Sequence, residues 1–123
     1  MAKEQNNLIV IAEDSRTQAE KLKFLLNGFG YEVAHGINGR EAFDLTKKYL
    51  PIMIITDIIM PVMDGYELCK KTSNHQVLGN RLYSVGQGRA KRIFSLDFRR
   101  LKKVFAHNLH ANYFFYALLP NSL

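Results

Sequence analysis

The chain has few of the features that mark secreted or membrane-bound proteins. Its 123 residues include one cysteine, Cys69, so no disulfide can form within the chain, and a small thiol in a reducing compartment is the simpler interpretation. The first seven residues are polar and lead into no secretory apolar segment. No apolar run reaches the roughly 20 residues that a membrane helix needs. We therefore expect a soluble, cytoplasmic protein.

Acidic residues are scarce in the last two-fifths of the chain. Residues 73–123 contain 8 Lys and Arg but one acid, Asp97, whereas residues 1–72 contain 9 Lys and Arg and 10 Asp and Glu. The net charge of +6 therefore belongs to the second part. Such asymmetry indicates either an anionic partner or two parts with different histories. The length is that of one domain, residues 1–123.

The first 71 residues alternate between short apolar runs and amphipathic segments. Ser15, with Gln18 three residues later, forms a capping box that predicts the start of a helix. Alternating strands and helices with short connections predict an α/β protein in which helices cover both faces of a parallel sheet. The predicted strands are Leu8–Ala12, Tyr31–Ala34 and Met53–Thr56, and the predicted helices begin near Ser15, Asn38 and Tyr66.

The pattern weakens from about Ser73. A short apolar stretch, Leu82–Val85, lies between turn-forming residues and predicts a fourth strand. Apolar residues at steps of three and four over residues 94–109 predict an amphipathic helix. The apolar run Tyr113–Leu119 is either a final strand or a buried helical turn, and it would promote aggregation if it were exposed.

Acidic residues follow two of the predicted strands. Glu13 and Asp14 come directly after the first strand, and Asp57 ends the third. Ligands of open α/β sheets bind at the carboxyl ends of the strands, so these carboxylates are expected to meet. Clustered carboxylates repel one another and need a compensating cation, and Mg²⁺ prefers oxygen ligands. The alternative is that these acids only cap helices and turns, the role we expect for Asp64 before Gly65.

Two segments resemble the receiver domain of two-component response regulators. They are LIVIAEDS at residues 8–15 and IITDIIMPVMDG at residues 54–65, and the resemblance covers residues 8–71 but is poor beyond them. It implies a flavodoxin-like fold, with a five-stranded parallel sheet flanked by helices. It also implies a signalling domain that accepts a phosphoryl group from a partner kinase. Such a domain is not an enzyme beyond self-phosphorylation from small phosphodonors and slow self-dephosphorylation.

The resemblance assigns roles to individual residues. Asp57 matches the phosphoacceptor, and Asp14 matches a direct Mg²⁺ ligand with Glu13 beside it as a direct or water-mediated ligand. The backbone carbonyl of Ile59 matches the third protein ligand of the metal. The implied partners are a sensor histidine kinase or phosphotransfer protein and a downstream partner protein, and a homodimer is left open.

The second part departs from the family pattern. Receiver domains end their fourth strand with Thr or Ser and their fifth with Lys, usually followed by Pro, but this chain has no Lys-Pro pair. Ser84 is a weak candidate for the switch hydroxyl, and Lys102 and Lys103 are poor candidates for the lysine because they lie on the polar face of the predicted helix. Residues 73–123 are therefore interpreted as a divergent, replaced or frame-shifted basic segment.

A second function remains open at this stage. In it, the chain is a truncated or inactive receiver-like interaction module whose basic C-terminal part contacts an anionic partner or self-associates. Nucleic acid is a less favoured partner, because the basic stretch Arg89–Lys103 reads as one polar helix face and no recognisable DNA-binding module accompanies it. The four histidines, His35, His75, His107 and His110, lack a metal-ligand spacing.

Overall fold

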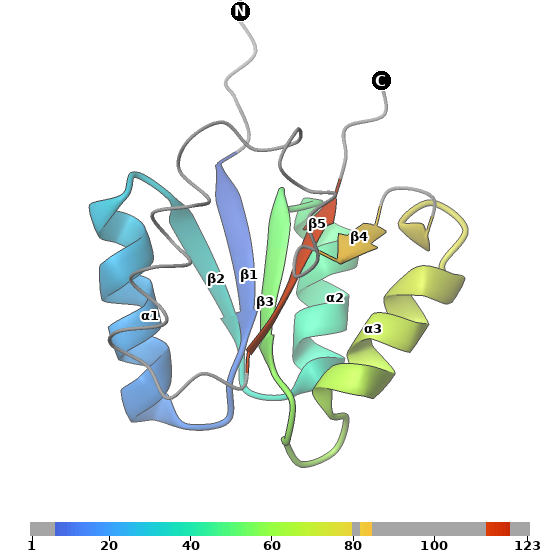
Figure 1. Ribbon diagram of the computed structural model, residues 1–123, viewed down its shortest axis with the longest axis horizontal. Coiled ribbons are helices and arrows are strands. Elements are labelled where there is room, and N and C mark those ends of the chain that lie inside the picture. Colours follow the sequence, from blue (N-terminus) through green and yellow to red (C-terminus); the bar gives the residue numbers. More distant parts are fainter. Residues whose placement is uncertain (1–6, 80–81, 85–112, 119–123) are drawn as a thin grey trace, which may run out of the picture.

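The computed structural model describes residues 7–79, 82–84 and 113–118 (Figure 1). Among these residues, no helix is long and apolar enough to span a membrane, and the longest has 13 residues. In chain order the elements are β1 (Leu8–Ala12), α1 (Arg16–Gly28), β2 (Glu32–Gly36), α2 (Gly39–Tyr49), β3 (Met53–Asp57), α3 (Gly65–Asn74), β4 (Leu82–Ser84) and β5 (Tyr113–Leu118).

The first three strands form the parallel sheet that the sequence predicts. β1 lies between β2 and β3, and the register pairs Ala12 with Gly36 on one side and with Thr56 on the other. Helix α1 covers one face of this sheet, while helices α2 and α3 cover the opposite face (Figure 1). The parallel sheet with helices on both faces confirms the predicted fold class.

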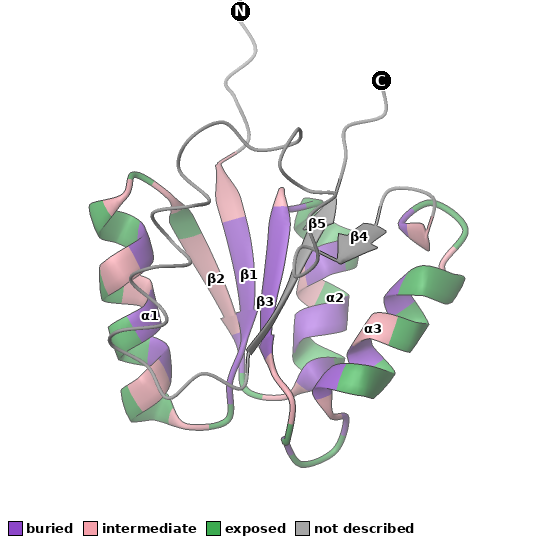
Figure 2. Cartoon of the chain, in the orientation of Figure 1, coloured by how far each residue is buried: buried purple, intermediate pink, exposed green. Residues whose placement is uncertain are grey.

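The two core clusters explain why β1 is apolar at every position. Ile9 and Ile11 pack with Leu22 and other α1 residues, whereas Val10 and Ala12 pack in the cluster that α2 and α3 cover. All four of these strand residues are completely buried (Figure 2). A strand buried on both faces has no polar side to show, and so its sequence is a continuous apolar run.

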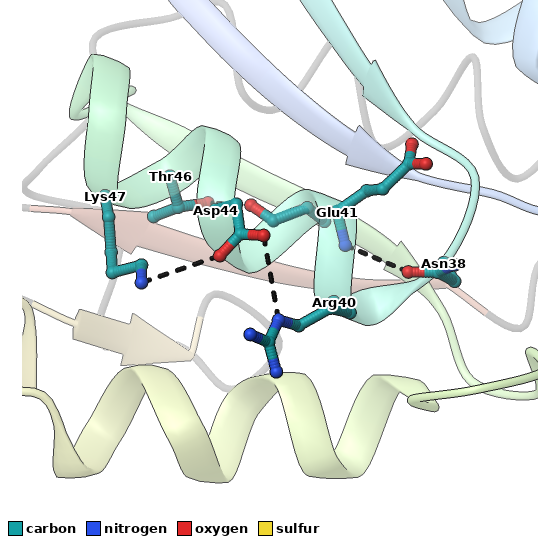
Figure 3. Close-up of polar contacts among 7 residues, drawn as sticks. Asn38, Arg40, Glu41, Asp44, Thr46 and Lys47 are labelled. Carbon is teal, nitrogen blue, oxygen red and sulfur yellow. Dashed lines mark hydrogen bonds and ion pairs between the residues drawn. The ribbon is translucent and has the colours of Figure 1, made fainter.

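Each described helix begins at a side-chain cap. The side chains of Ser15, Asn38 and Asp64 accept the backbone N–H three residues further on, at 3.3, 2.9 and 2.8 Å. On α2, Arg40 and Lys47 add ion pairs to Asp44 along the exposed face (Figure 3). Asp64 is thus the helix cap that its position before Gly65 predicts.

The C-terminal strands depart from an all-parallel sheet. β5 runs antiparallel to β3, and β4 runs antiparallel to β5, which gives the order β2-β1-β3-β5-β4. The five-stranded parallel arrangement that the resemblance implies is therefore corrected. A strand that pairs with the edge of β3 forms hydrogen bonds with its backbone groups whether it runs parallel or antiparallel. Residues 113–118 are rich in aromatic residues, which favour strands.

Several predictions for the second part can be compared with these strands. The predicted strand Leu82–Val85 is present as Leu82–Ser84, and Tyr113–Leu119 contains strand β5 rather than a helical turn. The predicted helix over residues 94–109 and the basic stretch Arg89–Lys103 lie outside the described residues, as do Lys102 and Lys103 themselves.

Candidate acidic site at the carboxyl edge of the sheet

Three carboxylates meet at the carboxyl ends of β1 and β3. One oxygen from each of Glu13, Asp14 and Asp57 lies within 4.8 Å of the other two. The register explains the meeting, because Ala12 pairs with Thr56 and the acids are the next residues of these two neighbouring strands. The sequence prediction that the three side chains come together is confirmed, while their chemical roles are considered below.

The backbone and side chain of Glu13 are held in place by three hydrogen bonds. Its N–H donates to the Gly36 carbonyl at 3.0 Å, and its carboxylate accepts the Ser15 N–H at 3.0 Å. Its carbonyl lies 2.7 Å from Nε2 of His35, which must carry the proton because a carbonyl only accepts. Glu13 is 2% exposed, whereas Asp14 is exposed and Asp57 half-buried. The site therefore has one buried acid and two acids that solvent can reach.

Asp57 is placed by the last residues of β3 and the first residue of α3. The buried Thr56 hydroxyl donates to the Asp57 carbonyl at 2.8 Å, and the Gly65 N–H donates to the Ile58 carbonyl at 2.9 Å. A Cβ at Gly65 would overlap the Asp57 carbonyl oxygen. Only glycine therefore allows α3 to begin so close to the end of β3.

The loop that connects Asp57 at the end of β3 to α3 exposes two of its apolar side chains to solvent. Met60 and Met63 are buried in the core, but Ile59 and Val62 are 79% and 78% exposed. The Met63 N–H donates to the Pro61 carbonyl at 2.7 Å across Val62, whose φ is 70°. That bond and that φ describe a γ-turn of the rare, strained form.

Among the described residues, no basic side chain forms an ion pair with Asp14 or Asp57. Within residues 7–79 the ion pairs are those of Asp44 with Arg40 and Lys47 on α2 (Figure 3). Carboxylates this close repel one another, more so where one is buried. Three carboxylates are also a donor set that a hard divalent cation prefers, so the residues present fit Mg²⁺.

Ser84 does not lie beside Asp57. It pairs with Tyr116 of β5, which pairs with Ile54, whereas Asp57 pairs with Tyr113. Three residues along the strands and two strand spacings across the sheet separate the two positions, roughly 10 Å in each direction. The register thus gives no support to Ser84 as a hydroxyl next to the acids.

Sequence reasoning missed the contacts of two residues near the site. His35, which lacks a metal-ligand spacing, contacts the backbone of Glu13 instead. Gln18 was expected to complete a capping box, but the Ser15 N–H donates to Glu13, and the buried Gln18 Oε1 has no hydrogen-bond partner among the described residues. The available signal for His35 was its position directly after the predicted strand Tyr31–Ala34.

Comparison with known proteins matches the chain to one family. The model of the response regulator receiver domain matches residues 9–89, which extends beyond the segment that resembles it by motif. The probable transcriptional regulator ycf29 of Porphyra purpurea is 42% identical over 66 residues, which cover 53% of this chain and 31% of that protein. The response regulator MprA of Mycolicibacterium vanbaalenii is 36% identical over 63 residues, covering 51% of this chain and 27% of that protein.

Solved structures agree with this match. The signal receiver domain of a signal transduction histidine kinase from Syntrophus aciditrophicus is 45% identical, with a TM-score of 0.57 over 59% of this chain and 55% of that one. The chain spans about a third of the length of the curated relatives that it matches. By the matched residues and the fold from β1 to α3, the chain belongs to the response regulator receiver domain family.

Proposed function

We propose that this chain accepts a phosphoryl group on Asp57 as part of two-component signalling. The observation that carries the proposal is the position of the Asp57 carboxylate, half-exposed at the end of β3 and within 4.8 Å of two further carboxylates. Family membership supports it, because the phosphoacceptor role is the one that the receiver motif assigns to this aspartate. A carboxylate is a competent nucleophile towards phosphorus.

The reaction would use few residues. A carboxylate oxygen of Asp57 attacks the phosphorus of a phosphohistidine, the new O–P bond forms, and the P–N bond breaks with its electron pair going to the imidazole. The imidazole then takes a proton from solvent. The chain's contribution would be to hold Asp57 where an incoming group can reach it, and the end of β3 and the tight start of α3 support this role by fixing the backbone on either side.

We assign the metal site to the same edge of the sheet. Asp14, Glu13 and Asp57 would hold Mg²⁺ together with the backbone carbonyl of Ile59, two residues after Asp57 on the exposed loop. When bound, Mg²⁺ supplies charge neutralisation for the transferred phosphoryl group. Glu13 is held by the Ser15 amide and thus presents its carboxylate to the site in a defined orientation.

The proposed partners follow from this chemistry. A sensor histidine kinase or a phosphotransfer protein supplies the phosphoryl group, and a downstream protein reads the modified surface. We further propose that the chain is one receiver-like domain whose residues 73–123 are divergent, replaced or frame-shifted. The antiparallel pairing of β5 with β3 and the distance of Ser84 from Asp57 support this proposal, although the family model matches as far as residue 89. In that arrangement, Asp57 would accept the phosphoryl group without a Ser84 hydroxyl beside it.

The test is intact-mass analysis after incubation with acetyl phosphate and Mg²⁺. The wild-type chain should gain one phosphoryl group, and both Asp57→Ala and added chelator should abolish the gain. Asp44→Asn is the matched control, because this carboxylate is exposed on α2 and belongs to a separate ion-pair network. A folded wild-type chain without any mass gain, or a gain that persists in Asp57→Ala, would refute the proposal.

A further inference from the structure

The end of β2 holds the backbone of Glu13 at two points. The Gly36 carbonyl accepts the Glu13 N–H at 3.0 Å, and the His35 ring lies 2.7 Å from the Glu13 carbonyl. β2 ends at Gly36. In a longer strand, a further backbone amide would donate to the Glu13 carbonyl, and here the His35 ring takes that place. A side chain therefore replaces the main chain at the position that leads into the acidic site.

Local packing explains why the strand cannot continue. A Cβ at Gly36 would lie 2.6 Å from the Ala42 nitrogen, so the first turn of α2 passes directly over the end of β2. The next amide, that of Ile37, donates to the Glu41 carboxylate at 3.1 Å as part of the start of α2. The chain thus turns away into the helix, and the His35 side chain remains to hold the Glu13 carbonyl.

We infer that His35 is a positioning residue for the acidic site and acts through the backbone of Glu13. This inference rests on the proposed metal-binding function. With its N–H, carbonyl and carboxylate all held, Glu13 presents its buried carboxylate to a cation without having to be ordered first. Removing one hydrogen-bond partner behind a metal ligand typically lowers metal affinity about tenfold or more.

His35→Phe removes the donor while keeping a planar ring of similar size, and His35→Gln restores an N–H donor. The probe is Mn²⁺, which accepts the same oxygen ligands as Mg²⁺ and whose free concentration is measured by electron paramagnetic resonance. We expect His35→Phe to weaken Mn²⁺ binding about tenfold. His35→Gln should recover most of the affinity, and thermal unfolding without metal separates this effect from a loss of folding.

A double-mutant cycle tests the route of the effect. Glu13→Gln should itself weaken Mn²⁺ binding, and His35→Phe should then have little further effect in that background, because both changes act on one ligand. Unchanged Mn²⁺ affinity in folded His35→Phe, or an equal loss in both backgrounds, would overturn this inference while leaving the proposed function in place. A wild-type chain that binds no Mn²⁺ would overturn both.

Discussion

Val62 adopts a backbone conformation that valine rarely occupies. Its φ of 70° lies in the left-handed region, where a β-branched side chain clashes with its own backbone. Burial of Met60 and Met63 on either side and the hydrogen bond from Met63 to Pro61 hold the residue there. The loop next to Asp57 therefore stores strain that packing on both sides maintains.

We predict that Val62→Gly raises the free energy of unfolding by about 0.5–1 kcal/mol, because glycine adopts this φ without a clash and the relief exceeds its entropy cost. Urea unfolding measures the change. Val77→Gly is the control, since Val77 is also an exposed valine, at 50% against 78% for Val62, but has no left-handed φ, and it should lose stability instead. Equal losses in both variants would show that Val62 is not strained.

At the scale of elements, the site depends on how closely α3 follows β3. Gly65 is the first residue of α3, and its amide closes the loop by donating to the Ile58 carbonyl. The space for a Cβ at this position is occupied by the backbone of Asp57. The helix start and the proposed phosphoacceptor therefore move together, and a change in one displaces the other.

Gly65→Ala is expected to lower the free energy of unfolding by about 2 kcal/mol, because the added methyl group forces backbone apart in a packed region. It should also slow phosphorylation by acetyl phosphate, since Asp57 moves relative to Glu13 and Asp14. Gly28→Ala is the matched control at the end of α1, where a Cβ meets nothing within 4 Å, and it should be neutral or stabilising. A tolerated Gly65→Ala with normal phosphorylation would contradict this coupling.

At the scale of the whole molecule, the proposed metal binding would be linked to folding through the acidic site. In the absence of a cation, the Asp14 carboxylate adds to the repulsion among three close carboxylates. In the presence of a cation, we propose that the same carboxylate is one of its ligands. We predict that Asp14→Asn stabilises the metal-free chain by up to about 1 kcal/mol, the range for interactions of exposed charges. Added Mg²⁺ should reverse the order of stability of the two chains.

Thermal unfolding with and without Mg²⁺ measures this reversal. At ten times the dissociation constant, a ligand that binds only the folded state stabilises it by about 1.4 kcal/mol, and the variant should lack most of that gain. Asp44→Asn again serves as control, because its carboxylate pairs with Arg40 and Lys47 instead. An equal response of Asp14→Asn and wild type to Mg²⁺ would remove Asp14 from the site.

Much of the fold between β1 and α3 could be predicted from the sequence. The apolar runs, helix caps and turn residues are local signals, and each records the environment of a few neighbouring residues. The meeting of Glu13, Asp14 and Asp57 also followed, because parallel strands bring their carboxyl ends to one edge whatever else the sheet contains. Strand ends were less accurate, and β2 lies one to two residues later than predicted.

The tertiary structure alone decided how distant segments combine. The run at residues 113–118 is a strand by its composition, but its direction beside β3 depends on where the intervening chain returns to the sheet, which no local pattern records. The same holds for His35, whose proposed positioning role depends on the Glu13 carbonyl 22 residues earlier. The sequence by itself determined which residues are apolar, acidic or turn-forming, whereas long-range pairing determined which backbone groups those side chains meet.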